Sequence, residues 1–202
     1  GQPFEAFCRE RIFEPLGMSD THFFLPEEKV ARLAAIYAPG PDKKIVRVTA
    51  DPATVGRITY SASFPYRGPR KYVSGGGGLV SSPGDYAKFL QMLLNEGELK
   101  GQRILKPETV REMTKNQIGE LSINNPLHGD KFGYGFGVAS KQLPTGASAG
   151  AYSWGGLFHT FFWVDPQEKL VGIVMTQLFP FDHSTLWADY QARVYDAVVR
   201  KK

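Results

Sequence analysis

The sequence predicts an α+β fold in which helices flank an antiparallel β-sheet. Three observations lead to this prediction. Apolar residues repeat at helical spacing in the first half of the chain and again near its C-terminal end. The final third contains short apolar runs that are rich in aromatic and β-branched residues. Two of those runs are separated by a short turn, a spacing typical of an antiparallel hairpin. Helices packed on such a sheet give an α+β or layered architecture.

Size and composition favour one globular domain. A chain of 202 residues with 42% hydrophobic residues is long enough for one core, so we expect residues 1–202 to belong to a single domain. The 24 basic and 20 acidic residues are scattered, and no basic stripe predicts nucleic-acid binding. No apolar run reaches the ~18 residues of a membrane span. Cys8 is the single cysteine and excludes an internal disulfide. These features do not distinguish a cytoplasmic from a periplasmic location.

The N-terminal half contains four predicted segments. Residues 2–13 form a helix with Pro3 in its first turn, and Pro15 and Gly17 end it. Residues 26–33 form a short helical stretch. Residues 38–72 have little periodicity, and a loop of this length is usually functional or carries short strands. A longer helix runs from Ser82 to Gly97.

Within this longer helix, Ser82 is the predicted N-cap. Pro83 occupies the first helical position, and Asp85 stands where a capping box requires an acid. A further helix begins at Pro107 and carries Val110.

The C-terminal third predicts strands and a last helix. Residues 132–138 alternate aromatics with glycine and predict one strand against which another backbone packs closely. Residues 158–164 and 170–176 predict a hairpin joined by the turn at 165–168. Apolar residues at helical spacing then predict a terminal amphipathic helix, which carries Trp187, Tyr190, Val194 and Val198.

One serine lies in a string that matches a nucleophile elbow. Ser148 is the centre of Gly146-Ala147-Ser148-Ala149-Gly150. The elbow requires a strand before it and a helix after it, whereas strand-like sequence lies on both sides here. The string matches while its context does not, so an α/β-hydrolase that uses Ser148 is kept as an alternative. It would need His183 and one of three acids, namely Asp165, Asp182 or Asp189.

Other catalytic patterns are absent from the sequence. No serine is followed three positions later by lysine, the spacing that places an amine beside a nucleophile on a helix. The histidines are widely separated, so we expect no metal site. They are His22, His128, His159 and His183. The glycine run at 75–78 is not followed by Gly-Lys-Ser/Thr, which excludes a P-loop. No cofactor is expected.

The string Trp154-Gly155-Gly156-Leu157 precedes a β-rich run. Two glycines at a strand allow a ligand or another backbone to come close. A strand with free N–H groups can also hold an oxyanion. Alone, the string is also compatible with a tryptophan that packs at the beginning of a strand.

Taken in order, several strings resemble the C-terminal half of class C β-lactamase-like serine hydrolases, especially family VIII carboxylesterases. Residues 12–21 are similar to that family's Ile-Phe-x-Pro-Leu-Gly-Met-x-Asp-Thr segment. The glycine run at 75–78 with Asp85-Tyr86 is similar to a glycine-rich segment that leads into a helix. The resemblance covers essentially the whole chain and continues in the strings at 97–99, 104–105, 132–137 and 162–166.

The resemblance implies a β-lactamase/transpeptidase-like fold and assigns roles to one strand. Trp154-Gly155-Gly156 matches the esterase version of the family's third active-site motif, so these residues would bind substrate. Leu157 would supply an oxyanion-hole backbone N–H. An indole in place of the lactamases' cation offers stacking area without charge. This favours hydrolysis of neutral carboxylic esters through an acyl-enzyme, and it is compatible with weak β-lactamase activity.

The resemblance also leaves a gap. The family's Ser-x-x-Lys and tyrosine motifs precede the segment where this sequence starts. Tyr60-Ser61 lies in the wrong place to be that tyrosine motif. We therefore expect an N-terminal segment or a companion chain to supply both motifs, and we expect this chain alone to be inactive. A non-catalytic binding module is the second alternative.

Overall fold

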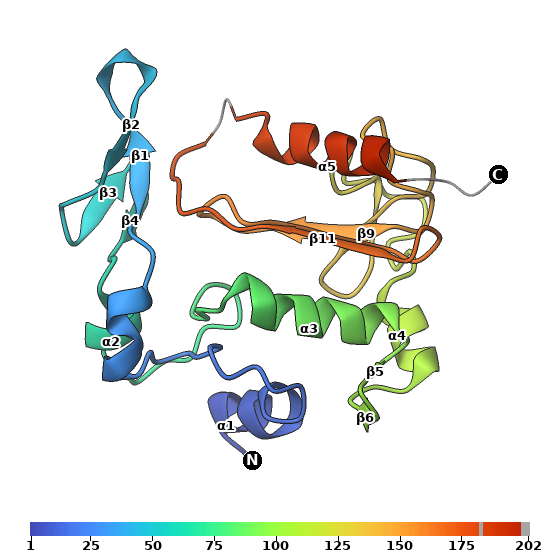
Figure 1. The fold of residues 1–202 in the computed structure, drawn as a ribbon, viewed down its shortest axis with the longest axis horizontal. Coiled ribbons are helices and arrows are strands. Elements are labelled where there is room, and N and C mark those ends of the chain that lie inside the picture. Colours follow the sequence, from blue (N-terminus) through green and yellow to red (C-terminus); the bar gives the residue numbers. More distant parts are fainter. Residues whose placement is uncertain (182–183, 199–202) are drawn as a thin grey trace. The chain divides into compact units, whose positions relative to one another are not determined.

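The computed structural model describes residues 1–181 and 184–198 (Figure 1). Their contacts form two compact units, and each unit draws on separate parts of the sequence. The first unit contains Gly1–Lys88, Leu157–His159 and residues 176–181. The second contains Phe89–Gly156, Thr160–Met175 and residues 184–198. That the whole chain forms one domain stays a prediction.

The first unit begins with helical turns. The α-helix α1 (Phe4–Cys8) continues into a π-helical turn, η1 (Arg9–Phe13), so the helix predicted for residues 2–13 is present but widens after Cys8. The 3₁₀-helix η2 (Glu27–Arg32) confirms the next predicted stretch. Cys8 is buried, and burial raises the pKa of its thiol.

The long aperiodic segment of this unit folds into short hairpins. Strands β1 (Tyr37–Pro39) and β2 (Ile45–Arg47) pair around the 3₁₀ turn η3 (Pro41–Lys43). Strands β3 (Ala53–Val55) and β4 (Ile58–Tyr60) form a second hairpin, followed by α2 (Phe64–Arg67). This confirms the prediction that a segment of this length carries short strands.

Helix α3 (Pro83–Leu94) begins in the first unit and ends in the second. The Ser82 hydroxyl accepts a hydrogen bond from Asp85 N–H at 3.2 Å, which confirms Ser82 as the N-cap. The capping box was wrong in its second half. The Asp85 carboxylate instead accepts hydrogen bonds from the Asp20 backbone N–H, the Thr21 hydroxyl and the Lys88 ammonium group. A buried carboxylate gains more from several donors than from one cap.

The second unit contains the main sheet. Its five strands lie in the order β11-β10-β9-β8-β7, and all neighbours are antiparallel. Before the sheet come the short hairpin of β5 (Glu98–Leu99) and β6 (Gln102–Arg103) and then helix α4 (Pro107–Met113), as predicted from Pro107.

The single strand predicted at 132–138 was wrong. These residues form a tight hairpin of β7 (Lys131–Phe132) and β8 (Gly137–Val138). Gly133 N–H donates to the Phe136 carbonyl at 2.8 Å, and Gly135 has a positive φ of 92° that closes the turn. Gly135 therefore helps reverse the chain, while Gly133 and Gly137 admit a neighbouring backbone as predicted: an added Cβ would overlap the Met113 carbonyl at Gly133 and the His128 carbonyl at Gly137.

The predicted C-terminal hairpin and helix are both present. Strands β10 (Phe161–Asp165) and β11 (Leu170–Val174) pair in full, and β9 (Tyr152–Gly155) lies on the other side of β10. Helix α5 (Leu186–Ala197) covers one face of this sheet, and the part of α3 that belongs to this unit lies toward the other face (Figure 1).

The core of the second unit lies between the sheet and α5. Phe161 and Trp163 are completely buried there, together with Ala147, Ala151 and Tyr195. Gly172 lies opposite Trp163 in the β10–β11 register, and a Cβ at Gly172 would overlap the indole ring. Glycine at this position therefore leaves room for the Trp163 indole over the neighbouring strand.

Candidate functional site

Strand β9 carries the predicted motif and is paired along only part of one side. Its pairing with β8 covers Tyr152 and Ser153 and then stops. Its pairing with β10 continues through Trp154 and Gly155. One side of the Trp154–Gly155 segment therefore has no neighbouring strand in the described sheet.

The tight turn after β9 determines which backbone N–H groups donate hydrogen bonds within the chain. Gly156 N–H donates to the Thr160 carbonyl at 2.8 Å, toward β10. Because N–H groups alternate sides along an antiparallel strand, the N–H of Gly155 points away from β10, to the open side. No described residue accepts a hydrogen bond from Leu157 N–H, and Leu157 is 46% exposed.

Both glycines of the motif are required by close packing. A Cβ at Gly155 would lie 2.6 Å from the ring of Trp187 on α5. A Cβ at Gly156 would overlap the Thr160 hydroxyl inside the turn. The glycines therefore admit side chains of this same chain, a purely structural reason for their presence.

Trp154 lies at the open end of β9 and is 39% exposed. Its indole packs against the imidazole of His128 in a tilted arrangement, with ring centroids 4.8 Å apart and planes at 33°. Phe132 meets the indole edge-on at 5.1 Å. A partly exposed indole held between two rings offers a flat apolar surface with one N–H donor.

His128 is a component of this site that sequence reasoning missed, because His128 was considered there only as a possible metal ligand. Its Nδ1 lies 2.9 Å from the Ser153 hydroxyl, and the side chain is only 6% exposed. Burial lowers the pKa of His128 to about 4, so its ring is neutral at ordinary pH. The position of His128 before the glycine-rich hairpin gave no signal of this contact.

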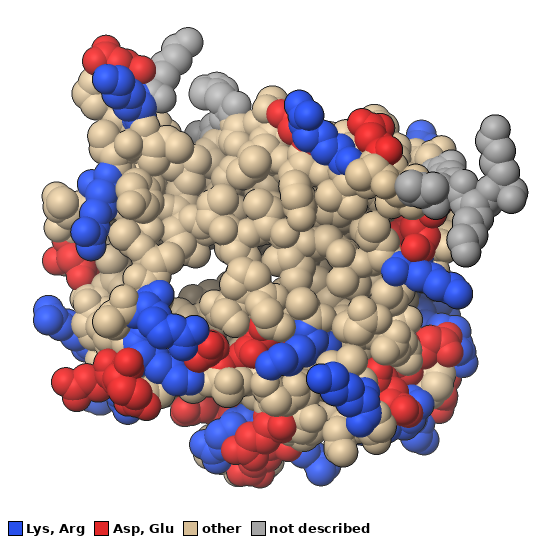
Figure 2. All heavy atoms as spheres, in the orientation of Figure 1, with Lys and Arg blue, Asp and Glu red and all other residues tan. Residues whose placement is uncertain are grey.

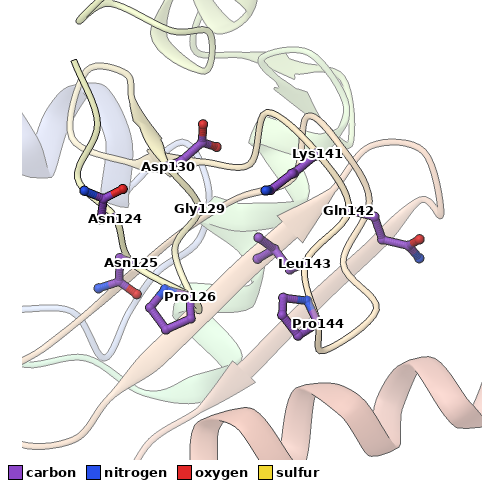
Figure 3. A pocket seen from close by; sticks show the side chains of 9 residues that line it. All are labelled: Asn124, Asn125, Pro126, Gly129, Asp130, Lys141, Gln142, Leu143 and Pro144. Atoms are coloured by element: carbon purple, nitrogen blue, oxygen red, sulfur yellow. The ribbon is translucent and has the colours of Figure 1, made fainter. Parts of the chain in front are cut away.

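A cavity of about 290 Å³ lies in the same unit, between the loop before β7 and the loop after β8 (Figure 3). It is lined mainly by Asn125 and Pro126 on one side and Leu143 and Pro144 on the other, with Lys141 at its edge. Another cavity, of about 360 Å³, lies beside α1 and η1 in the first unit. Neither is lined by Trp154 to Leu157.

The geometry around Ser148 is not that of a nucleophile elbow. Ser148 lies in the loop between β8 and β9, with no strand directly before it and no helix after it. Its backbone N–H donates to Asp165 Oδ2 at 2.9 Å. That carboxylate also accepts hydrogen bonds from the Tyr195 hydroxyl and from the backbone N–H groups of Gln167 and Glu168, and no histidine among the described residues is hydrogen-bonded to it. His183 and Asp182 lie outside the described residues.

The segment at 17–21 has a structural role in the first unit. Asp20 accepts two hydrogen bonds from Arg32, at 2.8 and 2.7 Å, and one from Lys29 at 2.9 Å. These cations hold the pKa of Asp20 well below its usual range. Thr21 bonds to Ser81 and Asp85. The motif thus fixes the loop to the beginning of α3.

Charge and hydropathy give no further site. On the face drawn in Figure 2, basic and acidic side chains are interspersed. Within the described residues, no helix combines the length and apolar character needed to cross a membrane. In the same residues, no three His, Cys, Asp or Glu side chains gather as a metal site would require.

Comparison with known proteins identifies the family. The family model described as Beta-lactamase matches residues 1–195, so the chain belongs to the β-lactamase and penicillin-binding-protein-like serine hydrolase family. As the resemblance implied, it has the C-terminal portion of the β-lactamase/transpeptidase-like fold.

Individual relatives are distant and longer. The chain is 28% identical over 189 residues to protein Rv1367c of Mycobacterium tuberculosis, covering 88% of this chain and 44% of that protein. It is 25% identical over 217 residues to lovastatin esterase of Penicillium rubens, covering 96% and 50%. A variant of simvastatin synthase from Aspergillus terreus superposes with a TM-score of 0.76 at 26% identity, covering 95% and 48%. The chain therefore spans about half the length of these relatives.

Proposed function

We propose that this chain supplies the substrate-binding strand and one oxyanion donor of a serine hydrolase that acts on carboxylic esters. A serine and a lysine base from an N-terminal segment or a companion chain complete the site. The observation that carries the proposal is that no described residue accepts a hydrogen bond from Leu157 N–H, in a chain segment that follows the partly unpaired strand β9. Family membership and relatives named as an esterase and a synthase support it.

In this mechanism the serine oxygen attacks the ester carbonyl while the base takes its proton. The carbonyl oxygen becomes an oxyanion, and Leu157 N–H donates a hydrogen bond to it. The alcohol leaves with a proton, and an acyl-enzyme remains. Water then attacks the acyl carbonyl, which releases the acid and returns the serine. No metal or cofactor takes part in these steps.

Trp154 contributes to substrate choice in this proposal. Its exposed indole face carries no charge, so it favours neutral acyl groups over the carboxylate of a β-lactam. Weak β-lactamase activity is part of the proposal because a lactam carbonyl can react with the same serine. Neutral esters should then be cleaved much faster than β-lactams.

A fluorophosphonate probe, which labels activated serines, tests the assignment. We expect no labelling of this chain alone and labelling of the complete protein on a serine that lies outside residues 1–202. Labelling of the isolated chain that Ser148→Ala abolishes would instead support the α/β-hydrolase alternative. No labelling of the complete protein would support a binding module and overturn the proposal.

The oxyanion role has its own matched pair of variants. Leu157→Pro removes the N–H, and Leu157→Ala keeps it while shortening the side chain. We expect Leu157→Pro to lower kcat for ester hydrolysis by about 10²–10³ in the complete protein. Leu157→Ala should stay within a few-fold of the unmodified protein. Equal rates for the two variants would remove Leu157 from the oxyanion hole.

A further inference from the structure

The indole of Trp154 is partly exposed, so its orientation depends on the side chains that hold it. Two rings contact it, His128 in a tilted face contact and Phe132 edge-on. An exposed tryptophan without such contacts would populate several rotamers. The side chain that fixes the contacted face therefore determines which surface of the indole is presented.

His128 is itself fixed from three directions. Its backbone N–H donates to Asn125 Oδ1 at 3.1 Å, and its Nδ1 meets the Ser153 hydroxyl at 2.9 Å. Its ring also lies 5.5 Å from Phe161 and 6.2 Å from Trp187, centroid to centroid. A side chain held by its backbone, a ring nitrogen and two neighbouring rings has little rotamer freedom left.

His128 lies next to the end of the β8–β9 pairing. A Cβ at Gly137 would lie 2.6 Å from the His128 Cβ, so His128 packs directly on the β8 residue that pairs with Ser153. Ser153 is the last residue of β9 that pairs with β8. His128 thus contacts β9 at the position where its pairing with β8 ends.

We infer that His128 is a positioning residue: its ring, anchored on Ser153, holds the Trp154 indole in the orientation that receives the acyl group of the ester. The inference rests on the proposed function for its substrate. It extends that proposal because it assigns acyl-group preference to a buried histidine that lies outside the proposed substrate-binding strand β9.

Simple core packing makes a different prediction from positioning. If His128 only fills space, its replacement lowers stability and all ester rates fall together. If it positions the indole, its replacement changes the environment of Trp154 and the relative rates for different acyl groups. The two roles separate in a ratio of rate constants, which a uniform loss of folded protein leaves unchanged.

The experiment uses three variants and one control. His128→Ala removes both the ring contact and the hydrogen bond, His128→Phe keeps a ring, and Ser153→Ala removes the anchor. The control is Lys141→Ala, an exposed residue of the same unit. Two quantities are measured, namely the indole N–H resonance of Trp154, assigned with Trp154→Phe, and kcat/KM for p-nitrophenyl acetate and p-nitrophenyl octanoate with the complete protein.

We expect the Trp154 resonance to shift clearly in His128→Ala and less in His128→Phe and Ser153→Ala. The octanoate-to-acetate ratio of kcat/KM should change by about tenfold in His128→Ala and little in the control. An unchanged resonance overturns the inference, as does a shifted resonance with an unchanged ratio. If the unmodified protein cleaves neither ester, the proposed function fails and the acyl-group role fails with it. A shifted resonance would then still support His128 as the side chain that positions Trp154.

Discussion

The carboxylate of Asp85 accepts a hydrogen bond from the backbone N–H of Asp20 at 2.6 Å, across 65 positions of the chain. The same oxygen accepts from the Thr21 hydroxyl at 3.1 Å, and the other oxygen pairs with Lys88 at 2.9 Å. Two segments that resemble family motifs in the sequence are therefore held together by one buried side chain. Their co-occurrence has a structural cause that is independent of catalysis.

Removal of the Asp85 carboxylate should destabilise the first unit. Asp85 is only 4% exposed, and Asp85→Ala leaves Asp20 N–H and the Thr21 hydroxyl without this acceptor. We expect the free energy of unfolding to fall by about 2–4 kcal/mol, measured by urea denaturation. Arg111→Ala, which breaks the exposed ion pair with Glu96, should be indistinguishable from the unmodified chain. Equal midpoints for the two variants would contradict this role.

The absence of a Cβ at Gly155 should matter for stability. Gly155→Ala forces a Cβ against the Trp187 ring at the base of α5, so we expect a loss of about 1–3 kcal/mol in urea unfolding. The double variant with Trp187→Leu should lose less than the sum of the two single losses. Gly84→Ala is the control, because no atom lies near its added Cβ and it sits in a helix. That variant should be neutral or more stable, and strict additivity of the double variant would refute the clash.

Replacement of Asp165 should reduce folding stability far more than replacement of Ser148, which it contacts. It is fully buried and accepts from Ser148 N–H and the Tyr195 hydroxyl, at 2.9 and 2.8 Å. We expect Asp165→Ala to cost more than about 3 kcal/mol and Tyr195→Phe about 1–2 kcal/mol. Ser148→Ala keeps the N–H and should stay within about 0.5 kcal/mol. Thermal unfolding of the three variants gives the order, and a Ser148→Ala loss as large as that of Tyr195→Phe would argue for a role of the hydroxyl.

Acid should weaken the fold through His128. Its pKa is lowered to about 4 by burial, below the usual 6.5, so the unfolded chain binds a proton more readily than the folded chain between these values. Stability is therefore complete above about pH 6.5 and falls toward pH 4, by at most ~1.4 kcal/mol per pH unit for this group.

Urea unfolding at several pH values measures this slope. Burial lowers the pKa of His22 and His159 as well, so they add to it in the same direction. His128→Phe should reduce the slope without abolishing it. A slope that His128→Phe leaves intact would mean that His128 does not titrate in this window.

Much of the fold follows from local pattern. The N-cap at Ser82, the helix that begins at Pro107 and the β10–β11 hairpin all lie where the sequence predicted them, with the hairpin turn displaced by one residue to 166–169. Each depends on residues within a few positions, through hydrogen-bond caps, fixed proline geometry or alternating burial. The order of motifs along the chain also indicated the family, and the family model confirms it.

The tertiary structure decided what depends on distant residues. It turned residues 132–138 into a hairpin, directed Asp85 to Asp20 rather than to its own helix, and placed His128 against Trp154. It also directed Gly156 N–H to the Thr160 carbonyl across the turn, while no described residue accepts a hydrogen bond from Leu157 N–H. Local sequence encodes which backbone conformation each residue prefers. Which donors and rings meet depends on how strands and loops far apart in the chain pack, and no local spacing records that.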